Sequence, residues 1–280
     1  LQYYRGNIII GTDGGGLTIA DLSNKKSEHF TKRGTGNSIS SNTVMSTLAD
    51  GDGIWLGTWD AGLDYFDLSQ KTFKNYNTII NQQETSTVEH VTAFCKDHKG
   101  RIWVGTFGFG LNYYSPVEDK LIHFCGRDAG NSIFDTENIH CLIETSTGDL
   151  LAGTMDGLYQ IKNPYGTPSI TRYQYNQKDS LSLSNNLVVS LFEDHKKQIW
   201  VGTIGGGLNL FDPQKEQFKR FSEHDGLPEN TIRSITEDKN NDLWISTNLG
   251  IARLNYETFE IKSYGGKTIQ QMGEFLISSS

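Results

Sequence analysis

Short apolar and alternating segments, separated by polar or glycine-rich turns, follow one another along the whole chain. Residues 187–192 form a mostly apolar run, as expected of a strand buried on both faces. Residues 199–203 are rich in β-branched and aromatic side chains. Residues 208–212 and 217–221 alternate apolar with polar positions, which is typical of half-exposed strands. This stretch therefore predicts four short strands joined by turns.

The same pattern recurs six times along the chain. A Gly-Thr pair, or Ser-Thr in the last copy, begins at residues 11, 57, 105, 153, 202 and 246, so the repeat is 44 to 49 residues long. Two residues before each pair stands a large side chain, here called the slot residue: Ile9, Trp55, Trp103, Leu151, Trp200 and Trp244. A Gly followed by Leu or Ile comes after each pair, at residues 16, 62, 110, 157, 207 and 250. Four strands at this period predict an all-β propeller with the slot tryptophans between neighbouring blades.

The two chain ends bear on how many blades form. The first unit lacks its leading strand, because Leu1 aligns with Phe192 at the end of that strand. Residues 273–278, after the last unit, have no unit of their own. Joining them to residues 7–30 would complete a sixth blade and remove two exposed sheet edges. We therefore expect one domain over residues 1–280, with six blades closed by the terminal strands; a seven-bladed ring with a missing piece is the alternative.

Composition narrows the class of protein. The chain has 25 Lys and Arg against 33 Asp and Glu, a formal charge of −8, which argues against contact with nucleic acid or an anionic membrane surface. The mean hydropathy is −0.47 and no long apolar run occurs, so no transmembrane helix is expected. The chain starts at Leu1 without Met, and we expect it to be a fragment of a longer multidomain protein. Any membrane contact would then be made by segments outside it.

The three cysteines indicate no framework of bridges. Cys95, Cys125 and Cys141 form no Cys-x-x-Cys pair, and their odd number excludes complete pairing. We expect buried apolar thiols.

The repeat resembles that of a known family. Residues 186–212 read Asn-x-Val, then Glu-Asp, then Ile-Trp-Val-Gly-Thr-x-Gly-Gly-Gly-Leu-Asn-x-Phe-Asp, and residues 88–114 and 230–256 repeat much of this. This resembles the two-component regulator propeller repeat, found in the periplasmic sensor regions of hybrid two-component systems of gut Bacteroidetes. The resemblance implies a periplasmic location, a histidine kinase elsewhere in the protein, a homodimer of the full-length chain, and oligosaccharides as stimuli.

Motifs that suggest catalysis or metal binding coincide with repeat positions. Residues 50–53 look like the start of a calcium loop, but they align with turns at residues 97–100 and 194–197 and lack the later Glu. The glycine triplets at 14–16 and 205–207 lack the helix and Lys-Ser/Thr pair of a phosphate cradle, so we interpret them as turns.

The histidines suggest no metal site. His98 and His195 occupy a turn position and are expected to be solvated, whereas His90 and His140 flank or enter leading strands and could approach the central channel. We predict no catalytic residues, no metal and no cofactor.

The best binding candidates lie where the repeat varies. Loops joining the second and third strands of a blade share a face with the connections between blades. Their variable positions are Asp13, Trp59, Asp60, Phe107, Phe109, Met155, Asp156 and Asn248. Trp59 is the one tryptophan outside the slots, so packing between blades does not explain it. Aromatic rings and carboxylates suit a sugar, whose ring stacks and whose hydroxyls donate hydrogen bonds.

These observations predict a non-catalytic, extracytoplasmic ligand-sensing propeller of a hybrid two-component protein. Two other functions stay open. A propeller lyase or glycosidase requires converging ionisable side chains in a central pocket, and a pure interaction scaffold requires a flat face without a small-molecule pocket.

Overall fold

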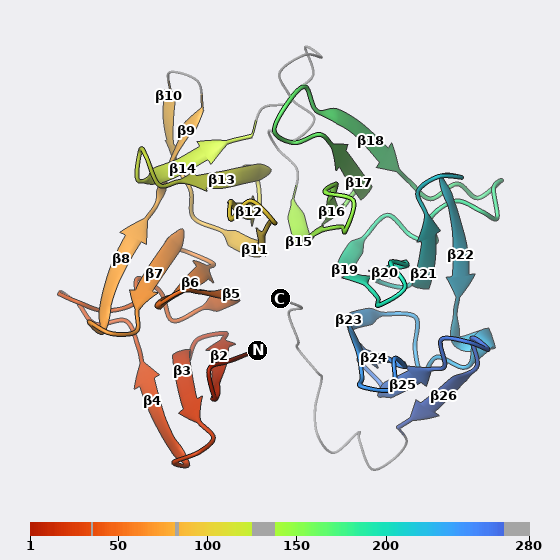
Figure 1. Ribbon diagram of the computed structural model, residues 1–280, viewed down its shortest axis with the longest axis horizontal. Coiled ribbons are helices and arrows are strands. Elements are labelled where there is room, and N and C mark those ends of the chain that lie inside the picture. The colour runs from red at the N-terminus through yellow and green to blue at the C-terminus, as the bar shows by residue number, and fades with distance from the viewer. Residues whose placement is uncertain (35, 82–83, 125–137, 266–280) are drawn as a thin grey trace. The chain divides into compact units, whose positions relative to one another are not determined.

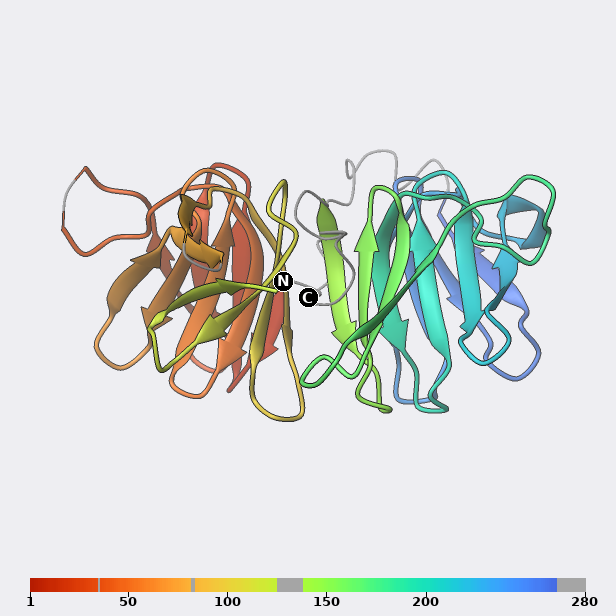
Figure 2. The ribbon, with the colours of Figure 1, turned by 90° about the horizontal axis from the view of Figure 1, so that it is seen from above.

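The computed structural model describes residues 1–280 except 35, 82–83, 125–137 and 266–280 (Figure 1). Apart from a short 3-10 helix at Glu223–Asp225, the regular structure of the described residues is β. Six sheets each contain four antiparallel strands in chain order, here called blades 1 to 6. The chain divides into two compact units, residues 1–142 and 143–279, and the boundary falls within β15. Figure 2 shows the blades of each unit side by side.

Unit 1 contains blades 1 to 3. Blade 1 is β1 (Gln2–Tyr4), β2 (Asn7–Thr12), β3 (Gly16–Asp21) and β4 (Lys26–Phe30). Blade 2 is β5 (Val44–Asp50), β6 (Gly53–Thr58), β7 (Leu63–Asp67) and β8 (Thr72–Tyr76). Blade 3 is β11 (Val91–Lys96), β12 (Ile102–Thr106), β13 (Leu111–Ser115) and β14 (Lys120–His123), extended by β9 (Thr78–Asn81) and β10 (Glu84–Thr87).

Blades 4 to 6 follow, all in unit 2 except the start of β15. Blade 4 is β15 (Ile139–Glu144), β16 (Leu150–Thr154), β17 (Gly157–Lys162) and β18 (Ser169–Tyr173). Blade 5 is β19 (Val188–Glu193), β20 (Ile199–Thr203), β21 (Gly207–Asp212) and β22 (Gln217–Phe221). Blade 6 is β23 (Ile232–Glu237), β24 (Leu243–Thr247), β25 (Ile251–Leu254) and β26 (Ile261–Tyr264).

The fold is therefore a six-bladed β-propeller with four-stranded blades, as predicted. The prediction that the first unit lacks its leading strand was wrong. Gln2 pairs with the slot residue Ile9 as Phe192 pairs with Trp200, so three N-terminal residues suffice for a short first strand. The predicted closing strand at residues 273–278 lies outside the described residues. That residues 1–280 form one domain stays a prediction.

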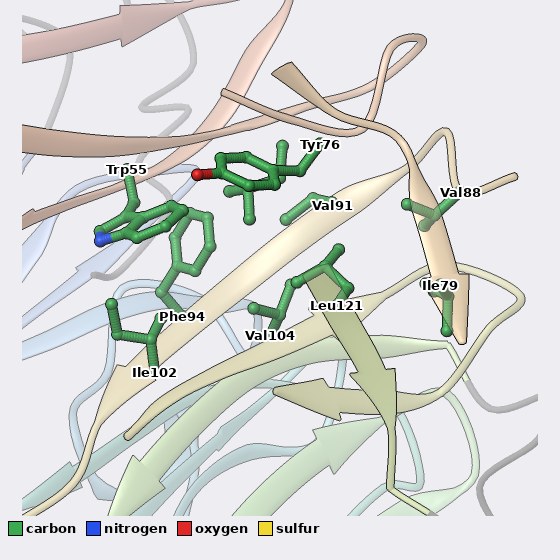
Figure 3. Packing of buried hydrophobic residues seen from close by; sticks show 10 residues of the cluster. Trp55, Tyr76, Ile79, Val88, Val91, Phe94, Ile102, Val104 and Leu121 are labelled. Atoms are coloured by element: carbon green, nitrogen blue, oxygen red, sulfur yellow. The ribbon is translucent and has the colours of Figure 1, made fainter. Parts of the chain in front are cut away.

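One hairpin lies outside the repeat pattern. β9 and β10 fall between blades 2 and 3 in the sequence, and β9 pairs in parallel with β14, the outer strand of blade 3. Ile79 of β9 and Val88, which follows β10, are buried in the core between blades 2 and 3 (Figure 3). The insertion thus widens the sheet of blade 3 to six strands.

The repeated Gly and Thr have separate physical roles. A Cβ on Gly202 would lie 2.6 Å from Ile232 of the next blade, so glycine allows the two sheets to approach. In every blade the Thr of the pair donates its Oγ1 hydrogen to the carbonyl of the Gly that ends the loop to the third strand. In blade 6 this Thr follows Ser246 instead of a Gly. The bonds join Thr12, Thr58, Thr106, Thr154, Thr203 and Thr247 to Gly16, Gly62, Gly110, Gly157, Gly207 and Gly250. In blades 1, 2 and 5 the Gly therefore allows close approach of the next blade, and in all six blades the Thr fixes one hairpin.

Three of the four slot tryptophans donate a hydrogen bond to an aspartate six residues earlier, which is buried in blades 3 and 5 and half-buried in blade 6. Asp194 accepts the indole Nε1–H of Trp200 at 2.9 Å and the backbone N–H groups of residues 196 and 198, both at 2.9 Å. Trp103 with Asp97, and Trp244 with Asp238, repeat this arrangement. In blade 2 the turn is one residue shorter, and Asp50 contacts Lys96 instead. Among the described residues Trp55 Nε1 consequently has no hydrogen-bond partner.

A side-chain contact joins consecutive blades at three seams, those of blades 1 and 2, blades 2 and 3, and blades 5 and 6. The residue involved on the earlier blade lies on its fourth strand, and its partner ends the turn between the third and fourth strands of the next blade. Glu28 pairs with Lys71 at 2.6 Å, Lys74 pairs with Asp119, and Lys219 lies 3.9 Å from the ring centroid of Phe259. The same two positions thus carry an ion pair, an ion pair of reversed polarity and a cation–π contact.

The aspartate–indole bond makes a prediction about stability. Replacing Asp194 with Ala leaves the indole N–H and two backbone N–H groups without their acceptor in a buried setting. We expect a loss of about 3 kcal/mol, seen as a fall of roughly 6–12 °C in the thermal unfolding midpoint.

Asp212→Ala is the matched control for that experiment. Asp212 also accepts two backbone N–H groups, but in an exposed turn and without an indole. Its loss should not exceed about 1 kcal/mol. Equal losses in the two variants would contradict the role given to the indole.

The contribution of Asp119 to the free energy of unfolding depends on pH, because its carboxyl has partners at the seam between blades 2 and 3. The Lys74 ammonium and the hydroxyls of Tyr114 and Tyr76 hold the pKa of this carboxyl below its usual value. Because the folded pKa is depressed, the stabilisation is complete above the unfolded value near ~3.9 and is lost as pH falls through the folded pKa. We expect Asp119→Asn to lower the unfolding free energy by a constant amount above about pH 4. The difference from wild type should shrink as pH falls below that value and vanish only below the depressed folded pKa of Asp119. Urea titrations between pH 2.5 and 6 measure this, and a difference independent of pH would contradict it.

Candidate functional site

The loops between second and third strands lie on the same face as the connections that lead into each blade. Backbone hydrogen bonds join the two sets, from Trp59 N–H to the Thr43 carbonyl at 3.1 Å and from Phe107 N–H to the His90 carbonyl at 3.0 Å. In unit 2, Ile204 N–H and the Leu187 carbonyl form the equivalent bond at 2.9 Å. This surface is here called the loop face of each unit.

Trp59 is held on the loop face of unit 1 by two rings of the next blade. Its indole stacks on His90, with centroids 4.4 Å apart and an interplanar angle of 24°, and lies 5.6 Å from Phe107. His90 Nδ1 also contacts the Trp59 carbonyl oxygen. The indole is still 38% exposed. The three rings therefore form an aromatic platform that is partly exposed.

This packing corrects one step of the sequence argument. The inference that packing between blades does not explain Trp59 was wrong, because His90 and Phe107 belong to the edge of blade 3. The sequence had suggested instead that His90 could approach the central channel. The signal for the contact was its position: His90 and Phe107 stand in blade 3 at the places that Thr43 and Trp59 occupy in blade 2, on the same face.

The other candidates of unit 1 differ in availability. Asp60 follows Trp59 directly and is exposed. Asp13 is exposed as well and accepts a hydrogen bond from Thr43 Oγ1 at 3.2 Å. Phe109 is instead turned inward, packed against the core between blades 2 and 3. The structure thus groups Trp59 with Phe107, leaves two carboxylates exposed on the same face, and packs the half-buried Phe109 against the core.

Two of the three candidate residues of unit 2 already have side-chain hydrogen-bond partners. Asp156 accepts Arg172 Nη1 at 2.6 Å and Gln174 Nε2 at 2.7 Å. Asn248 accepts Arg233 Nε at 2.7 Å and donates its backbone N–H to Glu229 at 3.1 Å. Met155 is 48% exposed. The sequence gave no sign of the Arg172, Arg233 and Glu229 contacts, because each partner lies on a different strand or loop. That these eight candidates touch a ligand stays a prediction.

The histidines and cysteines give little chemistry. Within the described ranges, no three His, Cys, Asp or Glu side chains gather as a metal site would require. His195 is exposed, as predicted, and its Nδ1 contacts the Glu237 carboxylate while the ring lies edge-on to Tyr256 at 5.0 Å. Burial lowers the pKa of His140. Cys95 and Cys141 are buried, as expected, and Cys125 lies outside the described residues.

Comparison with known proteins identifies the repeat. The family model described as "Two component regulator propeller" matches residues 86–108, 182–205 and 226–249, each covering the first two strands of a blade. Blades 3, 5 and 6 therefore match the two-component regulator propeller repeat. The resemblance inferred from the slot tryptophans and Gly-Thr pairs is therefore confirmed.

Two relatives have names from two-component signalling. The chain is 26% identical over 263 residues to "Histidine kinase P4" of Formosa agariphila. The match covers 92% of this chain and 19% of the relative. The chain is also 25% identical, with a TM-score of 0.54, to the extracellular domain of a protein named as a hybrid two component system of B. thetaiotaomicron, over 93% of this chain and 40% of that chain. The regulator propeller thus spans about a fifth and two fifths of these relatives.

A more distant likeness concerns the fold alone. Virginiamycin B lyase from Staphylococcus aureus is 14% identical, with a TM-score of 0.65, over 94% of this chain and 85% of that chain. No helix in the described part of the regulator propeller is long and apolar enough to cross a membrane.

Proposed function

We propose that this regulator propeller is a non-catalytic, periplasmic sensing domain of a hybrid two-component protein, and that it binds an oligosaccharide on the loop face of unit 1. The observation that carries the proposal is the aromatic platform of Trp59, His90 and Phe107, which is partly exposed and is followed in sequence by the exposed Asp60. Relatives that are a histidine kinase and an extracellular domain of a hybrid two component system support the sensing role.

The platform suits a sugar for a physical reason. Sugar rings have apolar C–H faces that stack on a flat ring, while their hydroxyls require polar partners. Asp60 and Asp13 are exposed acceptors on the same face. Since His90 and Phe107 already hold the indole, little side-chain entropy is lost when a ligand stacks on it.

Signalling would follow from unequal binding. We propose that the full-length protein is a homodimer and that ligand shifts the geometry of its two protomers. A ligand shifts such an equilibrium only by the difference in its affinity for the two arrangements. The propeller therefore needs no catalytic group of its own.

The test is calorimetric titration of the chain with neutral and acidic oligosaccharides of several linkages. We expect a saturable ligand whose affinity falls at least about tenfold in Trp59→Ala, because an aromatic contact at a binding centre contributes about 2 kcal/mol or more. His90→Ala should lower the affinity for the same ligand by a smaller factor, because the substitution makes the Trp59 indole more mobile without removing it.

Tyr3→Ala is the matched control, since Tyr3 is also an exposed ring, at 68%, but lies in β1. It should leave the affinity unchanged. Ligand cleavage during the titration would favour the lyase or glycosidase alternative. Saturable binding that is equal in wild type and Trp59→Ala would overturn the proposed site, and no binding by any oligosaccharide would overturn the ligand class.

A further inference from the structure

A cavity of about 340 Å³ opens at the seam between blades 1 and 2. It lies wholly within unit 1 and belongs to neither the loop face nor the aromatic platform. Its apolar lining is Ile9, Ile19, Ile54 and Leu68, and its polar lining is Tyr4, Arg5, Asn7, Asp21, Lys26, Glu28 and Lys71.

The cavity arises from the slot residue of blade 1. Trp55 and Trp200 fill the corresponding seams, packed against the next blade and 5% and 0% exposed. Blade 1 has the smaller Ile9 in that slot. Ile54, which lines the cavity, is equivalent to Ile102, which packs in the core that contains Trp55. The space is therefore the space that an indole ring takes elsewhere.

The polar partner of the indole is missing as well. The strand register puts Tyr4 at the position that Asp194 occupies in blade 5. Tyr4 donates its hydroxyl hydrogen to the Gly51 carbonyl at 2.7 Å and offers no carboxylate to a ring N–H. An occupant of this cavity is thus better matched if its ring system carries no N–H donor.

The charges at the cavity favour an anionic group on the occupant. Its lining contains three cationic side chains and two acidic ones. Both acids are already engaged, Glu28 by Lys71 at 2.6 Å and Asp21 by Ser23 and Asn24 of its own turn. Arg5 pairs with Asp52 at 2.8 Å. Over the part of the chain that the structure describes, Lys26 has no carboxylate partner, so its ammonium is the charge available to a ligand.

We propose that this seam is a second binding site, for a small aromatic carboxylate whose fused or substituted ring fills the empty slot and whose carboxylate pairs with Lys26. The volume is near the lower end of ligand pockets, roughly 300–1,000 Å³, which suits a bicyclic ring with a short acidic group. Such a ligand completes the blade 1–2 seam as Trp200 completes the blade 5–6 seam.

The probe is 2-naphthoate, titrated into the chain while the methyl resonances of Ile9, Ile19, Ile54 and Leu68 are followed by ¹³C NMR. We expect saturable ring-current shifts at these four residues. The neutral 2-naphthamide should bind about two- to fivefold more weakly, as expected of one exposed ion pair. Lys26→Ala should reduce the affinity for naphthoate by the same factor and leave that for naphthamide unchanged.

Filling the slot tests the location. Ile9→Trp should abolish the naphthoate shifts, and Leu68→Trp, which narrows the cavity from the turn of blade 2, should do the same if Ile9→Trp does not fold. Trp59→Ala should leave naphthoate binding intact, which separates this site from the aromatic platform. Absent or non-saturable shifts, equal affinity for acid and amide, or binding that survives a filled slot in a folded variant would each overturn the proposal.

Discussion

Close approach of one blade to the next is the constraint on which the rest of each unit depends. The second strand of a blade carries a glycine where the neighbouring sheet lies against it, since a Cβ on Gly202 would come within 2.6 Å of Ile232. The slot residue two positions earlier then decides what fills the seam. Where it is Trp with an aspartate six residues before it, as in Trp200 with Asp194, the seam is packed and the polar atom of the ring is satisfied. Burial and hydrogen bonding reinforce each other there, because the buried N–H would otherwise oppose the packing.

Binding capacity is found where this scheme is interrupted. Trp59 projects from a loop whose residues differ in every blade, and its stacking partners come from the blade beyond. Ile9 leaves a slot only partly filled. Both features are local departures on a conserved frame of main-chain pairing, and neither changes the strand order of its sheet. A repeat architecture thus separates the residues that hold the sheets from those free to contact ligands.

Prediction from the sequence succeeded where six copies carry the same information. The strand order, the slot residues and the loop glycines repeat at one period, so their roles followed from the pattern. The β9–β10 hairpin was missed because it lies between copies, where there is no second instance to compare. The stacking of Trp59 on His90 was missed because it joins two blades, and a period gives no side-chain direction across a seam. The cavity beside Ile9 was missed because a smaller residue in a repeated slot still reads as an apolar core position.

The polarity of the seam contacts bears on how such a chain can change its number of repeats. Glu28 meets Lys71 in the next blade, whereas Lys74 meets Asp119. If recombination deleted blade 2 and brought blade 1 against blade 3, Glu28 would face Asp119, and two carboxylates would repel each other at the junction. Blades 1 and 2 therefore each carry a charge that matches the blade that follows, and this opposes the loss of blade 2 that near-identical units would otherwise allow.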